Sequence, residues 1–166
     1  MKIRIAGYVK ESIVDGPGIR FTLFTQGCYF NCKGCHNPQT HDITAGREIE
    51  IDELIKLLIL SPLSHGLTIT GGEPFLQLDA LLELIIKAKP YVNNIIVYTG
   101  YTYEELINLS INNKIYSEIL TKIDYLIDGK FLIKEKDLTL QFRGSRNQRI
   151  IDMSKSNKNH IVIKSF

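Results

Sequence analysis

The sequence predicts an α/β protein built on a parallel sheet, an open and partial (β/α) barrel of about five or six strands. Strand-like segments rich in β-branched and aromatic residues alternate with segments that carry apolar residues at helical spacing, the pattern of parallel strands joined by crossover helices. Glycine and charged residues directly follow several strand-like segments, which is where such folds gather their chemistry. With this few strands a full eight-stranded barrel is excluded, and 166 residues fit one domain spanning residues 1–166.

The strands are predicted from short apolar runs that end in glycine, threonine or aspartate. The run 20–25 (RFTLFT) leads directly into a cysteine-containing loop, and 67–70 (LTIT) is short enough to be a buried strand. Two further runs, 95–99 (IIVYT) and 125–127 (YLI), end in Gly100 and in Asp128-Gly129. The segments 138–142 and 160–164 are candidates for two more strands.

The helices are predicted from apolar spacing and from their stop signals. The segment 50–60 ends before Pro62, and 79–89 is stopped by Pro90, because proline does not continue a helix. Thr102 and Glu105 form a plausible capping box at the start of a short third helix. The segment 115–120 is a fourth predicted helix.

Composition narrows the class of protein. Apolar residues make up 44% and charged residues 23%, and the net charge is only +2, with both signs interspersed. This argues against a nucleic-acid or membrane-surface binder. The first residues contain no continuous apolar segment, and the longest apolar runs, 57–60 and 84–86, are too short to span a bilayer. We therefore expect a cytoplasmic protein, in which thiols stay reduced.

All three cysteines lie in one short loop, Cys28, Cys32 and Cys35, with the spacing C-x3-C-x2-C. Clustered thiolates are soft ligands suited to zinc or to an iron–sulfur cluster. The odd number and the crowding argue against a disulfide framework. A zinc site needs a fourth ligand, for which His41 is a better candidate than His36, the neighbour of Cys35. In a [4Fe–4S] cluster, three thiolates leave one iron open to bind a small molecule.

The second motif, Gly71-Gly72-Glu73-Pro74, follows the predicted strand 67–70. Glycines at a strand end let a ligand approach the backbone because no Cβ stands in the way. The carboxylate of Glu73 adds an acceptor for a cationic group such as an amine. Alone the motif indicates only a turn, but next to the cysteine loop at one sheet edge it favours a ligand site.

Together these two motifs resemble the radical S-adenosylmethionine enzymes. The resemblance implies that Cys28, Cys32 and Cys35 hold a [4Fe–4S] cluster. It also implies that S-adenosylmethionine binds the open iron and is cleaved reductively to methionine and a 5′-deoxyadenosyl radical, which removes a hydrogen atom from the substrate.

Further motifs narrow the resemblance to the glycyl-radical-enzyme activases. These are VDGPGIRF before the first predicted strand, CHNP at the end of the cysteine loop, YTGY at 98–101, DYLIDGKF at 124–131 and FRGSRNQRI at 142–150. The resemblance runs from about residue 10 to residue 152. Gly34 departs from the wider superfamily, which commonly has an aromatic residue before the last cysteine.

The resemblance also implies roles for particular residues. The metal ligands would be Cys28, Cys32 and Cys35. The residues that contact the cofactor would be Gly34, His36, Asn37, Gly71, Gly72, Glu73, Thr99, Asp128 and Lys130. The residues that face the substrate protein would be Asp15, Arg143, Arg146 and Arg149. For the charged residues, a solvated surface or a turn is the alternative interpretation.

The implied function is formation of a glycyl radical on the large subunit of an anaerobic (class III) ribonucleotide reductase, with reduced flavodoxin or ferredoxin as electron donor. One alternative is a pyruvate formate-lyase-type activase or a small radical enzyme acting on a small molecule. The other is a non-enzyme, either an iron–sulfur electron carrier or a zinc-bearing interaction module. Neither nucleic acid nor a membrane is expected as a partner.

Overall fold

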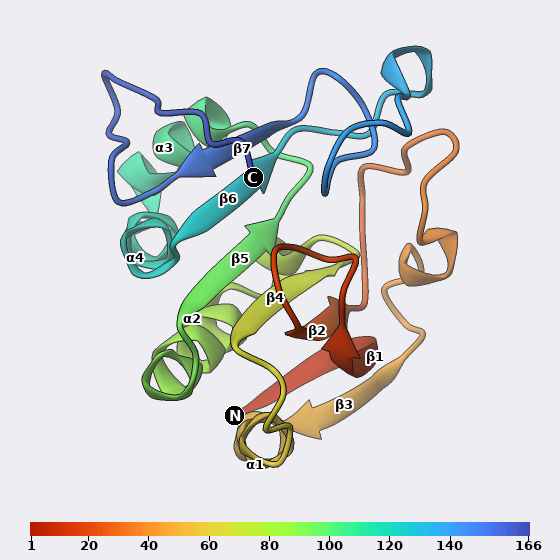
Figure 1. Ribbon diagram of the computed structural model, residues 1–166, viewed down its shortest axis with the longest axis vertical. Helices are drawn as coiled ribbons and strands as arrows, with labels where there is room; N and C mark the ends of the chain where they lie inside the picture. The colour runs from red at the N-terminus through yellow and green to blue at the C-terminus, as the bar shows by residue number, and fades with distance from the viewer.

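A seven-stranded sheet in the order β3-β1-β2-β4-β5-β6-β7 forms the centre of the computed structural model, which describes residues 1–166 (Figure 1). The strands are β1 (Lys2–Ser12), β2 (Arg20–Thr25), β3 (Arg47–Glu50), β4 (Gly66–Gly71), β5 (Asn94–Tyr98), β6 (Tyr125–Asp128) and β7 (Arg149–Asp152). The helices are α1 (Ile51–Ile59), α2 (Leu78–Ala88), α3 (Tyr103–Asn112) and α4 (Lys114–Lys122). Four short 3-10 turns lie at Pro38–Thr40, Pro74–Gln77, Lys89–Tyr91 and Ile133–Glu135.

The sheet is mixed. Strands β2, β4, β5 and β6 run parallel to one another, whereas β1, β3 and β7 add three antiparallel pairings at the two sides. The α/β class is therefore confirmed, and the predicted parallel direction holds for β2, β4, β5 and β6. The sheet as a whole is mixed, however, and has seven strands instead of about five or six. The reason is that β2 follows β1, and β7 follows β6, through connections without an α-helix, whereas parallel neighbours require a crossover connection.

The four predicted helices are confirmed to within a few residues. Thr102 Oγ1 accepts the backbone N–H of Glu105, whose carboxylate accepts the N–H of Thr102, so the predicted capping box is present at α3. None of the helices has the length and apolar character needed to cross a membrane.

The strand predictions are less accurate. Strands β1, β3 and β7 are not among the predicted strands. The segment 138–142 forms turns, and 160–164 is a loop with isolated bridges at His160 and Ile163. In β1 two register irregularities interrupt the alternation of side chains, which hides the strand from a period-two pattern. The segment 138–142 alternates apolar and polar residues, but its Leu138 is 82% exposed and no strand lies beside it. Strand formation needs a partner, and sequence pattern does not reveal one.

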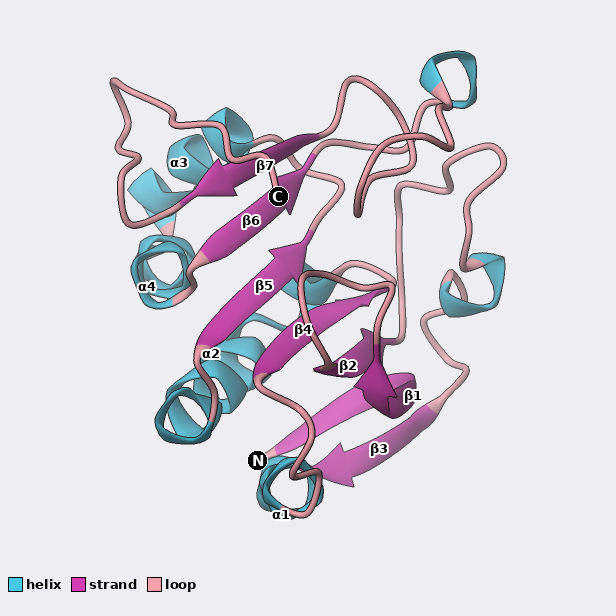
Figure 2. Ribbon diagram, in the orientation of Figure 1, coloured by secondary structure: helices cyan, strands magenta, loops and turns pink.

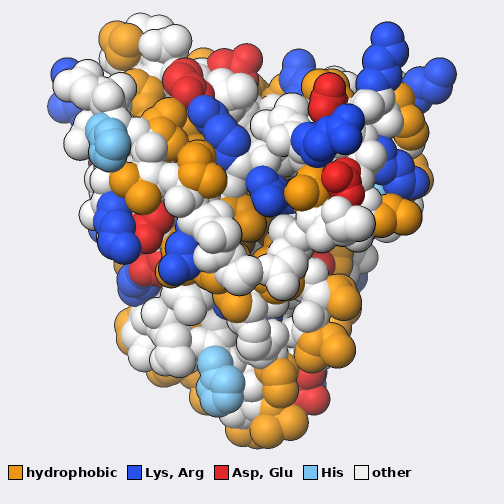
Figure 3. Space-filling view, turned by 45° about the horizontal axis from the view of Figure 1, so that its top comes forward, with side chains coloured by type: hydrophobic (Ala, Val, Ile, Leu, Met, Phe, Trp, Pro, Cys, Tyr) orange, Lys and Arg blue, Asp and Glu red, His pale blue; other side chains and the backbone are white.

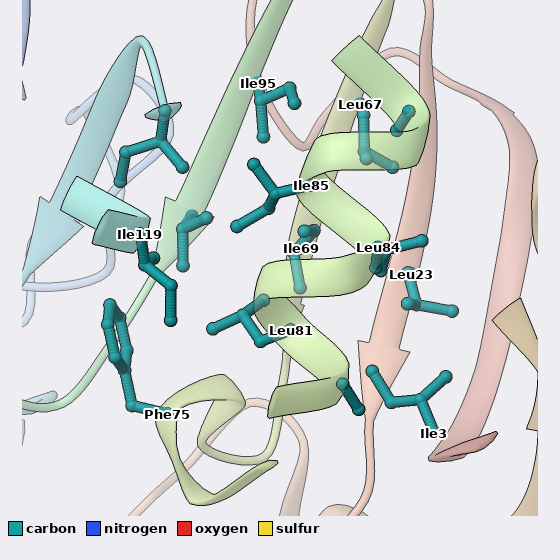
Figure 4. Packing of buried hydrophobic residues seen from close by; sticks show 14 of the residues in the cluster. Ile3, Leu23, Leu67, Ile69, Phe75, Leu81, Leu84, Ile85, Ile95 and Ile119 are labelled. Carbon is teal, nitrogen blue, oxygen red and sulfur yellow. The ribbon is translucent and has the colours of Figure 1, made fainter. Parts of the chain in front are cut away.

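The helices form one layer that covers a single face of the sheet (Figure 2). Leu81, Leu84 and Ile85 of α2 pack on strand residues that include Ile69 and Ile95, as Figure 4 shows, and all five side chains are fully or almost fully buried. Because side chains alternate along a strand, the intervening residues point to the other face. That helix-free face is the one that carries the site.

The loop between β1 and β2 crosses this helix-free face. Thr68 Oγ1 donates a hydrogen bond to the carbonyl of Asp15 at 2.8 Å. The buried guanidinium of Arg20 donates to Thr68 Oγ1 at 2.6 Å, to Asn94 Oδ1 at 2.8 Å and to the carbonyl of Pro17 at 3.3 Å. Removal from water on burial lowers the pKa of Arg20 to about 10. These bonds fix the loop against β4 and β5.

Candidate functional site

The carboxyl ends of β2, β4, β5 and β6 meet at one edge of the sheet, and the loops that follow them surround a cavity of about 650 Å³. The loop 13–19 and the helix-free face of the sheet complete its walls. The predicted site residues that line it are Asp15, Cys28, Cys32, Cys35, His36, Asn37, Gly71, Gly72, Glu73, Thr99, Lys130 and Arg143. Four predicted site residues, Gly34, Asp128, Arg146 and Arg149, do not line it.

The cysteine loop is closed at its base by backbone hydrogen bonds. The N–H of Gly27 donates to the carbonyl of Thr40 at 2.8 Å, and the N–H of Cys28 donates to that of His41 at 3.1 Å. Within the loop the N–H of Cys35 donates to the carbonyl of Cys32 at 3.1 Å. The loop is thus a defined turn structure that directs three thiols to one cavity.

The three thiols are a donor set that can hold an iron–sulfur cluster. All three are free and half-buried, and burial raises the pKa of the Cys28 and Cys32 thiols. No three histidine, cysteine or acidic side chains converge closely enough to hold one ion. Zinc needs its ligands around one centre, whereas each thiolate of a [4Fe–4S] cluster binds a different iron and the sulfurs lie farther apart. The donor set therefore suits a cluster with one iron left open.

The two glycines after β4 allow close contact with the start of the cysteine loop. A Cβ on Gly72 would lie 2.2 Å from the carbonyl oxygen of Gly27, and one on Gly71, at φ +100°, would lie 2.6 Å from the amide nitrogen of Thr25. The N–H of Gly72 donates to the carbonyl of Thr25, and the N–H of Glu73 donates to that of Gly27. The crowding at Gly72 thus comes from the chain's own backbone, whereas the sequence pattern suggested room for a ligand.

Glu73 is buried and joins the ends of β4 and β5. Its carboxylate accepts hydrogen bonds from the N–H of Phe75 at 3.0 Å, from Thr99 Oγ1 at 2.9 and 3.0 Å, and from the N–H of Gly100 at 2.8 Å. Desolvation raises the pKa of Glu73 to about 7 despite these donors. Its acceptor capacity is largely used within the protein, although it forms part of the cavity wall.

Lys130 lines the same cavity and lies in the loop after β6. Its Nζ is 4.8 Å from the ring centroid of Phe30, a residue of the cysteine loop. The ring of Phe30 also packs edge-on against Tyr101, with centroids 4.8 Å apart. A cation therefore lies beside the cysteine loop, placed by an aromatic ring.

The remaining residues of the cysteine loop lie near Phe131. The ring of His36 is 5.0 Å from that of Phe131, and the N–H of Asn37 donates to Cys35 Sγ at 3.4 Å. Gly34 has φ +75°, and a Cβ there would lie 2.6 Å from Ile133 Cδ1. Ile133 thus occupies the space that a side chain at position 34 would need.

Asp128 and Arg149 form an ion pair outside the cavity. Asp128 is buried and accepts hydrogen bonds from Arg149 Nε at 3.0 Å and from the N–H of Tyr103 at 2.8 Å. Arg149 also contacts Glu104, with Nη2 to Oε2 at 2.7 Å. This network joins β6, β7 and the first turn of α3. The resemblance implies a cofactor contact for Asp128 and a partner contact for Arg149, but neither residue lines the cavity.

Of the other residues predicted to face the substrate protein, two line the cavity and one lies outside it. Asp15 lines the cavity and accepts a hydrogen bond from Ser12 Oγ at 2.5 Å. Arg143 lines it as well; its Nη1 donates to the carbonyl of Gln148 at 3.1 Å, and its Nε is buried without a partner. Arg146 lies outside, exposed and paired with Glu135 at 3.3 Å.

Sequence reasoning missed several cavity residues, among them Phe30, Tyr98, Phe131 and Gln148. Tyr98 donates from its hydroxyl to the carbonyl of Phe142 at 2.9 Å, and burial raises its pKa, which keeps it a donor. The strand alternation was the available signal, because Val97 packs in the core under the helices, so its neighbour Tyr98 points to the helix-free side together with Ile96. Gln148 gives no such signal, because it lies in a loop before β7 and its position on the cavity wall depends on how that loop folds.

Comparison with known proteins adds independent information. A family model described as a 4Fe-4S single cluster domain matches residues 14–151. Three similar curated proteins are named anaerobic ribonucleoside-triphosphate reductase-activating protein. The one from Vibrio cholerae is 36% identical over 151 residues, covering 86% of this chain and 94% of the relative. The one from Haemophilus influenzae is 35% identical over 153 residues, covering 86% of this chain and 94% of the relative. The Escherichia coli K12 protein is 34% identical over 149 residues, with 85% and 93% covered.

Proposed function

Because the chain belongs to the family of anaerobic ribonucleoside-triphosphate reductase-activating proteins, we propose that it activates an anaerobic ribonucleotide reductase by generating a glycyl radical on it. The 4Fe-4S domain match extends over most of the chain and supports an iron–sulfur enzyme. We further infer that β2, β4, β5 and β6 form the parallel part of an open, partial barrel whose helix-free face holds the cofactors.

One observation carries this proposal: three free cysteines line the same cavity as the Gly71-Gly72 turn and Lys130. The cavity of about 650 Å³ extends beyond the cysteines to Asp15 and Arg143, which leaves room for a second ligand. An electron carrier needs only to hold its cluster, so this extension favours an enzyme.

When bound, a [4Fe–4S] cluster with an open iron supplies the electron that cleaves S-adenosylmethionine to methionine and a 5′-deoxyadenosyl radical, which then takes a hydrogen atom from the target glycine. Cys28, Cys32 and Cys35 would hold the cluster as thiolates. Loading releases protons from thiols whose pKa burial has raised, so it should be favoured at neutral to alkaline pH.

The cavity walls would orient the second ligand. Lys130 would pair with the carboxylate of S-adenosylmethionine, since it is one of two Lys or Arg side chains on the wall, and the backbone at Gly71 and Gly72 would face its amine. Glu73, with Thr99, would hold the ends of β4 and β5 together and orient these backbone groups. Asp128 and Arg149 would act from outside, by fixing the strand end that carries Lys130.

The substrate protein would complete the site. A reactive radical has to be shielded from water. The loop 13–19 and the segment that carries Arg143 both line the cavity. We infer that they border an opening, which the glycine-bearing segment of the reductase large subunit covers beside Asp15. Reduced flavodoxin or ferredoxin would supply the electron.

The test is a radical assay under anaerobic conditions. The reconstituted protein is reduced and mixed with S-adenosylmethionine and the reductase large subunit, and a glycyl-radical doublet is expected by electron paramagnetic resonance. Replacing the target glycine by alanine in the reductase should remove the doublet. A normal doublet on pyruvate formate-lyase, with none on the reductase, would instead assign the chain to the sister activases.

A further inference from the structure

The segment 130–148, here called the arm, projects between β6 and β7 beside the cysteine loop (Figure 1). Its two halves are joined by backbone hydrogen bonds, from the N–H of Arg146 to the carbonyl of Glu135 at 2.8 Å and from the N–H of Asp137 to that of Gly144 at 3.2 Å. The arm is thus a hairpin-like structure with defined geometry.

The base of the arm is tied to the end of β6. Asn147 Nδ2 donates to the carbonyl of Lys130 at 2.9 Å, and Gln148 Nε2 donates to that of Gly129 at 3.0 Å. Gln148 Oε1 accepts the N–H of Gly144 at 2.9 Å. The arm also supplies part of the cavity wall, so a molecule that covers the cavity has to contact it.

The arm concentrates positive charge. It contains five basic and two acidic residues, a net charge of +3 in a chain whose total is +2, so the remainder carries −1. Arg146 is paired with Glu135, whereas Lys134 and Lys136 are exposed and have no ion-pair partner. Figure 3 shows Lys and Arg side chains gathered on the upper right of this face, where Figure 1 places the arm.

Apolar side chains accompany these lysines on the surface. Leu132 and Ile133 are almost half exposed, and Leu138 is more exposed than any other large apolar side chain of the protein. Val14 and Tyr29, on the two other loops around the site, are each 71% exposed. Exposed apolar anchors with a charged surround are typical of a protein-binding surface.

We propose that the arm is a docking site for an acidic segment of the reductase large subunit that also carries apolar side chains. This inference rests on the proposed function. Charge complementarity selects the partner, because Lys134 and Lys136 are free cations, and Leu132, Ile133 and Leu138 supply apolar contacts. Since the arm is already held by its own hydrogen bonds, docking requires little ordering of the chain.

A charge-reversal experiment tests the proposal on the full, cluster-loaded chain. Lys134→Glu/Lys136→Glu should weaken binding to the reductase large subunit at least about tenfold at low salt, and the loss should shrink as salt increases. Lys56→Glu/Lys114→Glu is the matched control, with the same change of charge on exposed residues of α1 and α4, and should bind normally. Cleavage of S-adenosylmethionine by dithionite-reduced protein without the reductase should be equal in all three proteins.

The outcomes separate this inference from the proposed function. Wild-type affinity in the arm variant, with a normal radical doublet, would overturn the docking site and leave the function intact. Weakened binding in the arm variant, with no doublet even from the wild type, would support the docking site and reject the activity. An equal loss in the control would show a general charge effect and would also overturn the proposal.

Zero-length carbodiimide cross-linking tests the chemistry of the partner. The reagent joins lysine amines to carboxylates in contact, so Lys134 or Lys136 should be linked to aspartate or glutamate of the large subunit. Mass spectrometry should place these links in one acidic segment that also contains apolar residues. Links confined to lysines outside the arm would contradict the proposal, whatever the binding data.

Discussion

The proposed iron–sulfur site of this protein depends on three residues, Cys28, Cys32 and Cys35. They are the only cysteines of the chain, and all lie on one cavity wall. A cluster with three protein ligands has no spare thiolate, so the loss of one sulfur leaves a second iron exposed to solvent and exchange.

Replacing any one of the three, for example Cys28→Ala, should abolish stable iron binding. After anaerobic reconstitution, iron and sulfide analysis should give about four irons per chain for the wild type and much less than that for the variant. Tyr29→Ala, an exposed neighbour in the same loop, is the control and should retain its iron. One zinc and no iron in the wild type would contradict the assignment.

Lys130 is the residue we expect to bind the cofactor carboxylate. Lys130→Ala should raise the dissociation constant for S-adenosylmethionine about tenfold, equal to roughly 1.4 kcal/mol, because one charge-assisted contact is lost. Equilibrium binding to the cluster-loaded protein measures this effect, and Lys134→Ala, outside the cavity wall, serves as the control. Normal affinity in Lys130→Ala would remove the lysine from the site but would not affect the family assignment.

Among the structural elements, the end of β4 and the start of the cysteine loop lie so close together that a side chain at position 72 has no room. The backbones approach so closely at Gly72 and Gly27 that hydrogen bonds form on both sides of the contact. The element that carries the cysteines is therefore positioned by the strand end beside it.

Gly72→Ala should destabilise the protein by about 1–3 kcal/mol, because the new Cβ would overlap the carbonyl of Gly27. Denaturant unfolding measures the stability, and iron content after reconstitution should fall as well, since the cysteine loop is displaced. Gly7→Ala is the control, because a Cβ there would have no atom within 4 Å. Equal free energies of unfolding for the two variants would mean that the backbone accommodates a Cβ at position 72 without loss of stability.

At the scale of the whole molecule, the buried Glu73 links the parallel strands and makes global stability depend on pH. Its pKa in the folded protein is about 7, raised by burial above the ordinary value of 4.5. The folded state therefore binds more protons than the unfolded chain between these values, and stability falls as pH rises from about 4.5 to 7.

We expect the wild type to lose up to about 3 kcal/mol more than Glu73→Gln over this pH range, since glutamine does not ionise. Urea unfolding of both proteins at several pH values gives the difference. The variant should be less stable at the acid end, because one amide donor then faces the N–H of Gly100. If the free energies of unfolding of the wild type and of Glu73→Gln changed equally from pH 4.5 to 7, the pKa of Glu73 would not be raised by folding.

The sequence by itself determined the local features of this protein. The C-x3-C-x2-C spacing, the Gly-Gly-Glu-Pro turn and the Thr102–Glu105 capping box depend on neighbouring residues, and helix positions follow from apolar spacing and from the stops at Pro62 and Pro90. The gathering of the site at one sheet edge was also predictable, because parallel strands end on the same side.

Only the tertiary structure decided which partners each residue meets. The direction of β1, β3 and β7 depends on neighbours far away in the sequence, so no local pattern predicted the antiparallel pairings. For the same reason, Asp128 is bound to Arg149 outside the cavity, and Gly72 faces the backbone of Gly27. Residue type and spacing define which chemistry is possible, whereas long-range packing determines which donor, acceptor or cation remains free to perform it.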